Sequence, residues 1–248
     1  MSDVKQHIQK IGSFVGKLLR ENFGKGPESV YVSCGSHFMT IYLRNFMSPP
    51  ERVLMEQDQD IIVQQMRQKL FESLEPEIRT YIDMETGVRL QEMYYDWNLH
   101  NKSGIIMGIS SAPFGSEEPV EEDYAGKQQV DYEIVKISQQ AQKTPEEYYS
   151  CLINPRTLIA VRNGILVRIE KELIRHGQGD LLKSIKRNLE KSYLHNSSLF
   201  EAALQKRVVD IFVDWDFDLD KSMITFILNP KPLQGENDLN TVDMSMQR

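Results

Sequence analysis

Apolar residues near the start of the chain recur every three or four positions, which is the spacing of an amphipathic helix. One stripe contains the residues Val4, Ile8, Ile11, Val15 and Leu18. We therefore expect a helix over residues 3–23. Gly24 is its predicted stop, because glycine readily adopts the left-handed conformation that ends many helices.

Strand-like runs and a second helix follow. Strands are predicted at 29–34, 38–45, 88–99 and 104–110. In the segment "SPPE", Ser48 is a candidate N-cap, and Glu51 completes a capping box for a helix that runs to about residue 74. Pro76 is expected to begin a separate helical piece. The order α-β-β-α-β-β predicts an α+β unit of antiparallel hairpins covered by helices.

The same pattern is written a second time. The two tryptophans lie in Asp96-Trp97 and Asp214-Trp215, which are 118 positions apart. That shift also places "IYLRN" at 41–45 on "IAVRN" at 159–163, and a shift of 119 places the first apolar helix on a series at 130–137. Agreement at separate places indicates a tandem duplication.

The boundary between the copies is visible in the composition. We place the first copy at 3–110 and the second at 124–229, and we expect them to form an intramolecular pseudo-dimer. Residues 111–123 contain prolines, a glycine and several acids, which predicts a solvated acidic linker. The polar segment 230–248 is predicted to be a disordered tail.

Strand alternation separates the tryptophan from the aspartate. Trp97 and Trp215 share a face with apolar neighbours, so we expect them in the core beneath the helices; a stacking platform for a base or sugar is the alternative. Asp96 and Asp214 are expected on the opposite face. The last strand of each copy is apolar on both faces, which is typical of a central or doubly covered strand.

Arg44 and Arg162 are expected to occupy matching positions on the same face as the aspartates. One interpretation is a cross-strand ion pair. The other is an anion site in which these arginines act with Asn45 and Asn163, because a guanidinium fork suits carboxylate, phosphate or bicarbonate-like oxyanions.

The composition of the chain argues against several classes of function. The net charge of -7 and pI near 5.4 disfavour sequence-independent binding to nucleic acid. Apolar runs are shorter than the roughly 20 residues that span a bilayer, and the start of the chain lacks the apolar core of a signal peptide. We therefore expect a cytoplasmic protein, peripheral at most to a membrane complex.

Candidate chemistry is sparse. Cys34 and Cys151 are expected to be buried thiols, and the five histidines show no metal-ligand spacing. The aspartates between Asp210 and Asp220 are interpreted as a solvated strand face and turn, with a metal site as the alternative. No catalytic residue, metal or cofactor is predicted.

Three stretches carry a family resemblance. "ENFGKGPESVYV", "IYLRNFMSPPERVLM" and "YYDWNL" resemble the MpsC family, whose members are described as parts of a membrane-potential-generating or cation-translocating system. The resemblance covers residues 4–110 well and the second copy more loosely. It implies association with membrane components linked to cation or inorganic-carbon uptake, and it brings no catalytic residues.

Two hypotheses follow. The first is a non-enzymatic binding or regulatory protein whose partner is a protein such as a membrane transport subunit. The second is a sensor that binds a small anion or nucleotide between the two copies. We expect either a monomeric pseudo-dimer or a homodimer, without direct insertion into the membrane.

Overall fold

The computed structural model describes residues 2–115 and 120–232. The first copy contains α1 (Ser2–Phe23), β1 (Ser29–Gly35), β2 (Phe38–Arg44), α2 (Pro49–Glu56), α3 (Asp60–Thr86), β3 (Leu90–Asn98) and β4 (Ser103–Ser110). The second copy contains α4 (Lys127–Ala141), β5 (Glu147–Asn154), β6 (Thr157–Asn163), α5 (Arg168–Arg175), α6 (Gly179–Asn196), α7 (Leu199–Leu204), β7 (Lys206–Asp216) and β8 (Lys221–Pro232). The predicted tandem α+β architecture is confirmed.

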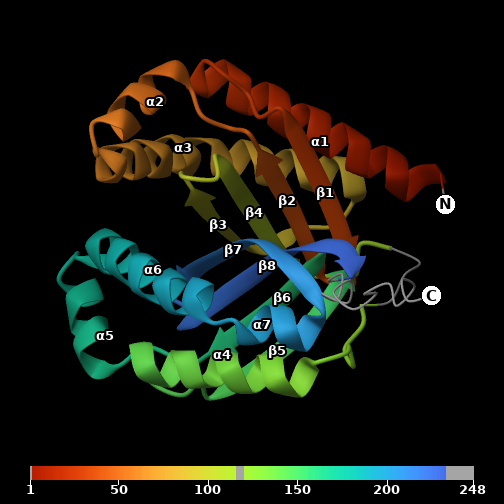
Figure 1. Cartoon of the computed structure of the whole chain (residues 1–248). Helices are drawn as coiled ribbons and strands as arrows, with labels where there is room; N and C mark the ends of the chain where they lie inside the picture. Colours follow the sequence, from red (N-terminus) through yellow and green to blue (C-terminus); the bar gives the residue numbers. More distant parts are fainter. Residues whose placement is uncertain (1, 116–119, 233–248) are drawn as a thin grey trace, which may run out of the picture.

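Each copy folds its strands into one antiparallel four-stranded sheet, in the orders β1-β2-β4-β3 and β5-β6-β8-β7. The two sheets face each other, and the helices cover their outer faces, so the molecule has four layers (Figure 1). One apolar cluster lies under the helices of each copy, and a third lies between the sheets. The doubly apolar strands β4 and β8 occupy inner positions, as predicted.

The helix predicted at the start of the chain is confirmed. Ile11, Val15 and Leu18 are buried in α1, and the residues at the matching positions of α4 are buried as well. Gly24 has a φ of 73°, which lies in the left-handed region that residues other than glycine disfavour. The repeated apolar stripe therefore covers the outer face of each sheet.

The predicted break at Pro76 is wrong. The helical region breaks earlier, after Glu56, where Asp58 adopts a φ of 56°, and α3 then continues through Pro76. The buried residues on both sides of the proline form one continuous face of the helix: Phe71, Leu74, Ile78 and Ile82. Burial along this face outweighs the loss of one backbone hydrogen bond.

The segment predicted to be a solvated linker is partly packed. Phe114 is buried in the first helical core. Glu121 exchanges backbone hydrogen bonds of 2.8 and 3.0 Å with Leu152 on β5, although its side chain stays exposed. The prediction of a solvated linker at 111–123 is therefore wrong at Phe114, whose apolar ring is buried in the core.

The predicted tail overlaps the last strand. Strand β8 extends to residue 232, so residues 230–232 belong to the second sheet. The rest of the predicted tail, 233–248, lies outside the described residues.

Candidate functional site

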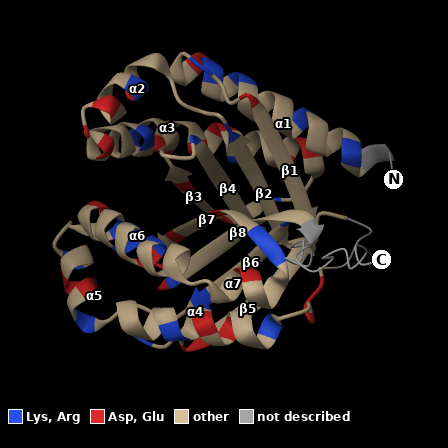
Figure 2. Ribbon diagram, in the orientation of Figure 1, with Lys and Arg blue, Asp and Glu red and all other residues tan. Residues whose placement is uncertain are grey.

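Asp96 and Asp214 lie on the face opposite the tryptophans, as strand alternation predicts. Trp97 and Trp215 pack in the two helical cores, whereas the aspartates point toward the other copy. Their exposed fractions are 0% and 1%, so both carboxylates are removed from water. A buried carboxylate is strongly unfavourable unless charged or hydrogen-bonding partners surround it. Figure 2 shows that most charged residues lie on the helices. Arg162 and Asp210 are also charged residues that the strands bury.

The cationic partners of both aspartates come from α6 of the second copy. Arg187 on α6 places Nε 3.0 Å from Asp96 Oδ1 and Nη2 2.8 Å from Asp214 Oδ1. One turn away on either side, Lys191 Nζ lies 2.5 Å from Asp96 Oδ2, and Lys183 Nζ lies 3.2 Å from Asp214 Oδ1. We call these five residues the inter-copy charge cluster.

Protonation of the cluster follows from its geometry. Burial lowers the pKa of Arg187, but the two carboxylates more than offset this, so its pKa lies above the usual value. Burial also lowers the pKa of Lys191, Asp96 opposes this effect, and the neighbouring Arg187 adds to the lowering. All four carboxylate oxygens have donors within the protein, since Asp96 also accepts from Trp97 N and Val213 N, and Asp214 from Tyr95 N. The cluster therefore joins the two copies through buried ion pairs and hydrogen bonds.

The cluster is not symmetric. With a shift of 119, the cations at 183, 187 and 191 correspond to Gln64, Gln68 and Glu72 on α3. The second copy therefore supplies the cations for both aspartates, while Gln68 instead donates to Asp180 on α6. The copies have diverged so that one helix neutralises a shared pair of charges.

The structure does not bring Arg44 and Arg162 together, and the proposed pairing is wrong. The β1–β2 and β5–β6 hairpins both have two-residue turns, so Phe38 matches Thr157, and the correct shift in this region is 119. Arg162 therefore matches Leu43, and the two arginines lie on opposite faces of their sheets.

Arg162 is fully buried on the helical side. It donates to Glu190, Ser138 and Ser222 over 2.7 to 2.8 Å. The predicted ion pair of Arg162 with an aspartate is also wrong, because its guanidinium pairs with Glu190 on α6 instead. Arg162 is thus part of the second core.

The two asparagines of the predicted anion site are also engaged. Asn45 donates to Glu28 at 2.5 Å, and Asn163 donates to Glu147 at 2.8 Å. Both amides therefore tie the end of one strand to the start of its neighbour. Arg44 is exposed at the end of β2, where it lines a cavity.

A cleft of about 460 Å³ opens between the copies beside Arg44. We call it the arginine cleft. Its walls are formed by Tyr31, Val32, Ser33, Thr40, Tyr42 and Arg44 from the first copy and by Arg156, Thr157, Val209, Ile227, Leu228, Asn229 and Pro230 from the second.

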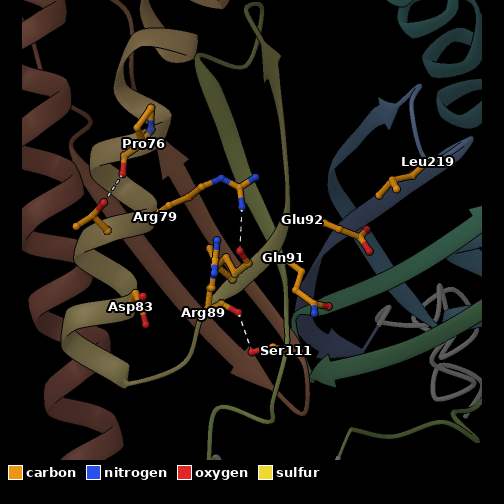
Figure 3. A pocket seen from close by; sticks show the side chains of 10 residues that line it. Pro76, Arg79, Asp83, Arg89, Gln91, Glu92, Ser111 and Leu219 are labelled. Carbon is orange, nitrogen blue, oxygen red and sulfur yellow. Dashed lines mark hydrogen bonds between the residues drawn. The ribbon is translucent and has the colours of Figure 1, made fainter.

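A larger hollow of about 980 Å³ lies where α3 faces the start of β3 (Figure 3). Its charged residues are mixed in sign, and two of them are already engaged. Arg79 bonds Glu75 and the Leu90 carbonyl, and Glu92 accepts from Lys221 at 2.7 Å. This broad depression offers less for a ligand than the arginine cleft.

The thiols are poor nucleophiles. Burial raises the pKa of Cys34 to about 12, and burial also raises the pKa of Cys151. Thiolate is the reactive form, so both are held inert near neutral pH. Within residues 2–115 and 120–232, no group of three or more His, Cys, Asp or Glu side chains is arranged to hold a metal ion.

Apolar side chains remain exposed on the helical hairpins of both copies. On α6 they follow every fourth residue, at Leu181, Ile185 and Leu189, with 57%, 56% and 39% of each exposed. On α3 the matching residues Ile62 and Met66 are 47% and 36% exposed. We call these the apolar ridges. Exposed apolar residues thus occur at matching positions on the surface of both copies.

The fold and its contacts define the structural class of the protein. It is a tandem α+β pseudo-dimer with apolar ridges on two helical hairpins and a cleft between its copies. A family model described as "Na+-translocating membrane potential-generating system (MpsC)" matches residues 4–111 and 127–230, and the chain belongs to this family. Neither the curated proteins nor the solved structures yielded a match. Among the described residues, no helix is both long and apolar enough to cross a membrane.

Proposed function

We propose that this chain is a non-enzymatic binding and regulatory protein that acts in the cytoplasm as an accessory component of a membrane cation or inorganic-carbon transport system. The family description supports the link to a membrane system. The observation that carries the binding role is the pair of apolar ridges.

The ridges differ from ordinary exposed apolar residues, which are scattered singly. Leu181, Ile185 and Leu189 are spaced by four, so they lie along one side of α6. Ile169 and Leu173, with 65% and 38% of each exposed, add a second such row on the adjoining helix α5. An amphipathic helix of a partner would bury both rows, because its apolar residues recur at the same helical spacing and can pack against them. The partner we propose is such a helix on a membrane subunit.

The buried charges support a binding role in a second way. The inter-copy charge cluster fixes the two copies, and therefore the two ridges, relative to each other. A preorganised surface loses little conformational entropy when a partner docks. The duplication thus supplies in one chain the rigid double surface that a single unit would obtain only by dimerising.

Co-purification with the membrane subunits of the transport system tests this proposal. The double variant Leu181→Ser/Ile185→Ser removes the ridge on α6, and we expect it to lose the membrane subunits during affinity purification. Met84→Ser is the matched control, because Met84 is 79% exposed at the other end of α3. Thermal melts establish that both variants fold. Equal retention of the subunits by the ridge variant and the wild type would reject the ridge as the docking surface.

The non-enzymatic part of the proposal rests on the inert thiols and on the fully engaged aspartates of the charge cluster. Its test is a turnover assay with purified protein. Any turnover that disappears in Asp210→Asn, and not in a surface control, would contradict it. Asp210 is the informative position because it is 2% exposed and accepts hydrogen bonds from Tyr42, Asn98 and Asn101.

The second candidate function is a sensor that binds a small anion or nucleotide between the copies. The arginine cleft is the observation that favours it, since residues of both copies line that cavity. The two functions are compatible, because the ridges lie on the outer helices and the cleft lies between the sheets.

A further inference from the structure

We propose that the arginine cleft binds a small organic anion, one that carries a carboxylate or phosphate group on a flat apolar body, with Arg44 and Arg156 as the anion ligands. This inference goes beyond the proposed docking of a partner on the ridges. It also replaces the sequence-based set of four residues with a pair that the fold brings to one cavity.

Both copies build the cleft. Arg44 ends β2 of the first copy, and Arg156 lies in the two-residue turn between β5 and β6 of the second. Both side chains are exposed and line the same cavity. The inter-copy charge cluster links the two copies that carry these arginines.

The charge of the cavity is one-sided. Among the thirteen described residues that line it, two are arginines and none is an aspartate or glutamate. The chain as a whole carries a net charge of -7, so a cationic cavity runs against its overall charge. Guanidinium groups recognise carboxylate and phosphate oxygens through paired donors.

One buried acid lies close behind the wall. Asp210 accepts hydrogen bonds from Tyr42 Oη at 2.7 Å, Asn101 Nδ2 at 2.7 Å and Asn98 Nδ2 at 2.9 Å. These donors cover its carboxylate and separate it from the cavity. Tyr42 and Arg44 are two positions apart on β2, so they share one face of the sheet.

The apolar and aromatic residues of the cleft walls indicate which non-ionic part the ligand has. Val209, Ile227 and Leu228 give the cavity apolar surface, and the rings of Tyr31 and Tyr42 lie nearly parallel with centroids 6.3 Å apart. Tyr31 is 45% exposed, which leaves part of its ring free for contact. A volume of about 460 Å³ suits a small organic molecule better than a bare ion, since ligand pockets are commonly ~300–1,000 Å³ and mostly apolar.

The edge of the second sheet shows what closes such an opening. There the edge strand β5 is covered by the segment between the copies: Glu121 pairs with Leu152, and Val120 packs into the cluster between the sheets. Tyr149 on β5 donates to Glu122 of the same segment. The chain thus fills one side of the interface with an apolar residue flanked by acids, and the cleft beside β1 is open to a ligand of the same character.

Isothermal titration with matched probes tests the inference. Benzoate and adenosine 5′-monophosphate carry the two candidate anionic groups, and benzamide and adenosine are their uncharged counterparts. Inorganic phosphate alone tests whether charge suffices. We expect at least one aromatic anion to bind, its uncharged counterpart to bind about tenfold more weakly, and phosphate alone to bind more weakly as well. Preference for benzoate or for the nucleotide distinguishes the carboxylate from the phosphate ligand.

Two variants locate the site. Arg44→Ala and Arg156→Ala should each weaken binding of the preferred anion about tenfold, because each removes a charged donor. Arg52→Ala is the control, since Arg52 is an exposed arginine of α2 that does not line the cleft. Binding that is unchanged in both cleft variants, equal binding of charged and uncharged probes, or no binding of either anion at millimolar concentration would overturn the inference. None of these outcomes affects retention of the membrane subunits, so the docking proposal is tested separately.

Discussion

Asp96 and Asp214 accept hydrogen bonds from each other's strands. Asp96 Oδ2 accepts from the backbone N–H of Val213 at 3.0 Å, and Asp214 Oδ2 accepts from the backbone N–H of Tyr95 at 2.9 Å. Strands β3 and β7 are edge strands, whose outward N–H groups lack a neighbouring strand. Each copy therefore uses its aspartate to satisfy the open edge of the other copy, and Arg187 forms an ion pair with both aspartates.

Replacement of Arg187 by methionine should destabilise the protein. The variant leaves two buried carboxylates without their shared cation, and breaking a buried pair in this way costs about 3–5 kcal/mol. We expect the free energy of unfolding, measured by urea denaturation, to fall by that amount. Lys183→Met is the matched control, because the Lys183 side chain is 20% exposed and contacts Asp214 alone within this cluster, so its loss should be smaller. Equal losses in the two variants would refute the bridging role of Arg187.

Gly104→Ala should also be destabilising, for a steric reason. A Cβ atom at Gly104 would lie 2.3 Å from Trp97 Cε3, and overpacking a core in this way costs about 1–3 kcal/mol. Gly12→Ala is the opposite case, since its Cβ would meet Val32 at an ordinary 3.5 Å, and alanine favours the helix by about 0.5–1 kcal/mol. Thermal unfolding of both variants should give shifts of opposite sign. A neutral Gly104→Ala variant would show that the indole ring can move aside.

Much of the fold could be predicted because the relevant signals are local. The apolar stripe of α1, the capping box formed by Ser48 and Glu51, and the alternation around Trp97 depend on residues close in sequence. The structure confirms each of them. The helix break was misplaced because a proline is a strong local signal, while the buried face of α3 that overrides it depends on tertiary packing.

The candidate site was harder to predict because its contacts join distant parts of the chain. Asp96 and Asp214 could be placed on one face of each strand, but their cations come from α6, about 90 residues after Asp96 and 30 before Asp214. A sequence signal did exist: Lys183, Arg187 and Lys191 recur at helical spacing in a chain that is acidic overall. The arginines were mispaired because a shift of 118 fits the second half of each copy, whereas the first half follows 119. In a strand, an error of one residue moves a side chain to the opposite face.

The different environments of Arg162 and Arg44 predict different outcomes for the two substitutions. Arg162→Met leaves Glu190, which is 1% exposed, without its cation, so we expect a loss of about 3–5 kcal/mol in the free energy of unfolding. Arg44→Ala removes an exposed side chain and should change stability by no more than about 0.5 kcal/mol. Urea denaturation of both variants checks the contrast. A large loss in the Arg44 variant would make that residue structural and would weaken its assignment as a ligand.

Alkaline pH should unfold this protein through its tyrosines. Burial is the largest cause of a raised pKa in six of them: Tyr42, Tyr94, Tyr95, Tyr124, Tyr148 and Tyr149. The unfolded chain releases these protons near pH 10, whereas the folded chain retains them. Each tyrosine therefore contributes stability that is fully present below about pH 10 and is lost as the pH rises further.

One group of the charge cluster acts in the opposite direction. The lowered pKa of Lys191 means that the folded state gives up this proton more readily than the unfolded state, which favours folding as the pH approaches the unfolded value of about 10.4. Six tyrosines outweigh one lysine, so we expect the free energy of unfolding to fall between pH 9.5 and 11 in a series of urea titrations. Tyr94→Phe isolates the cause: it removes one titrating phenol, so its free energy of unfolding should fall less steeply over the same range, whatever its stability at pH 7. Parallel slopes for the variant and the wild type would mean that other groups drive the alkaline transition.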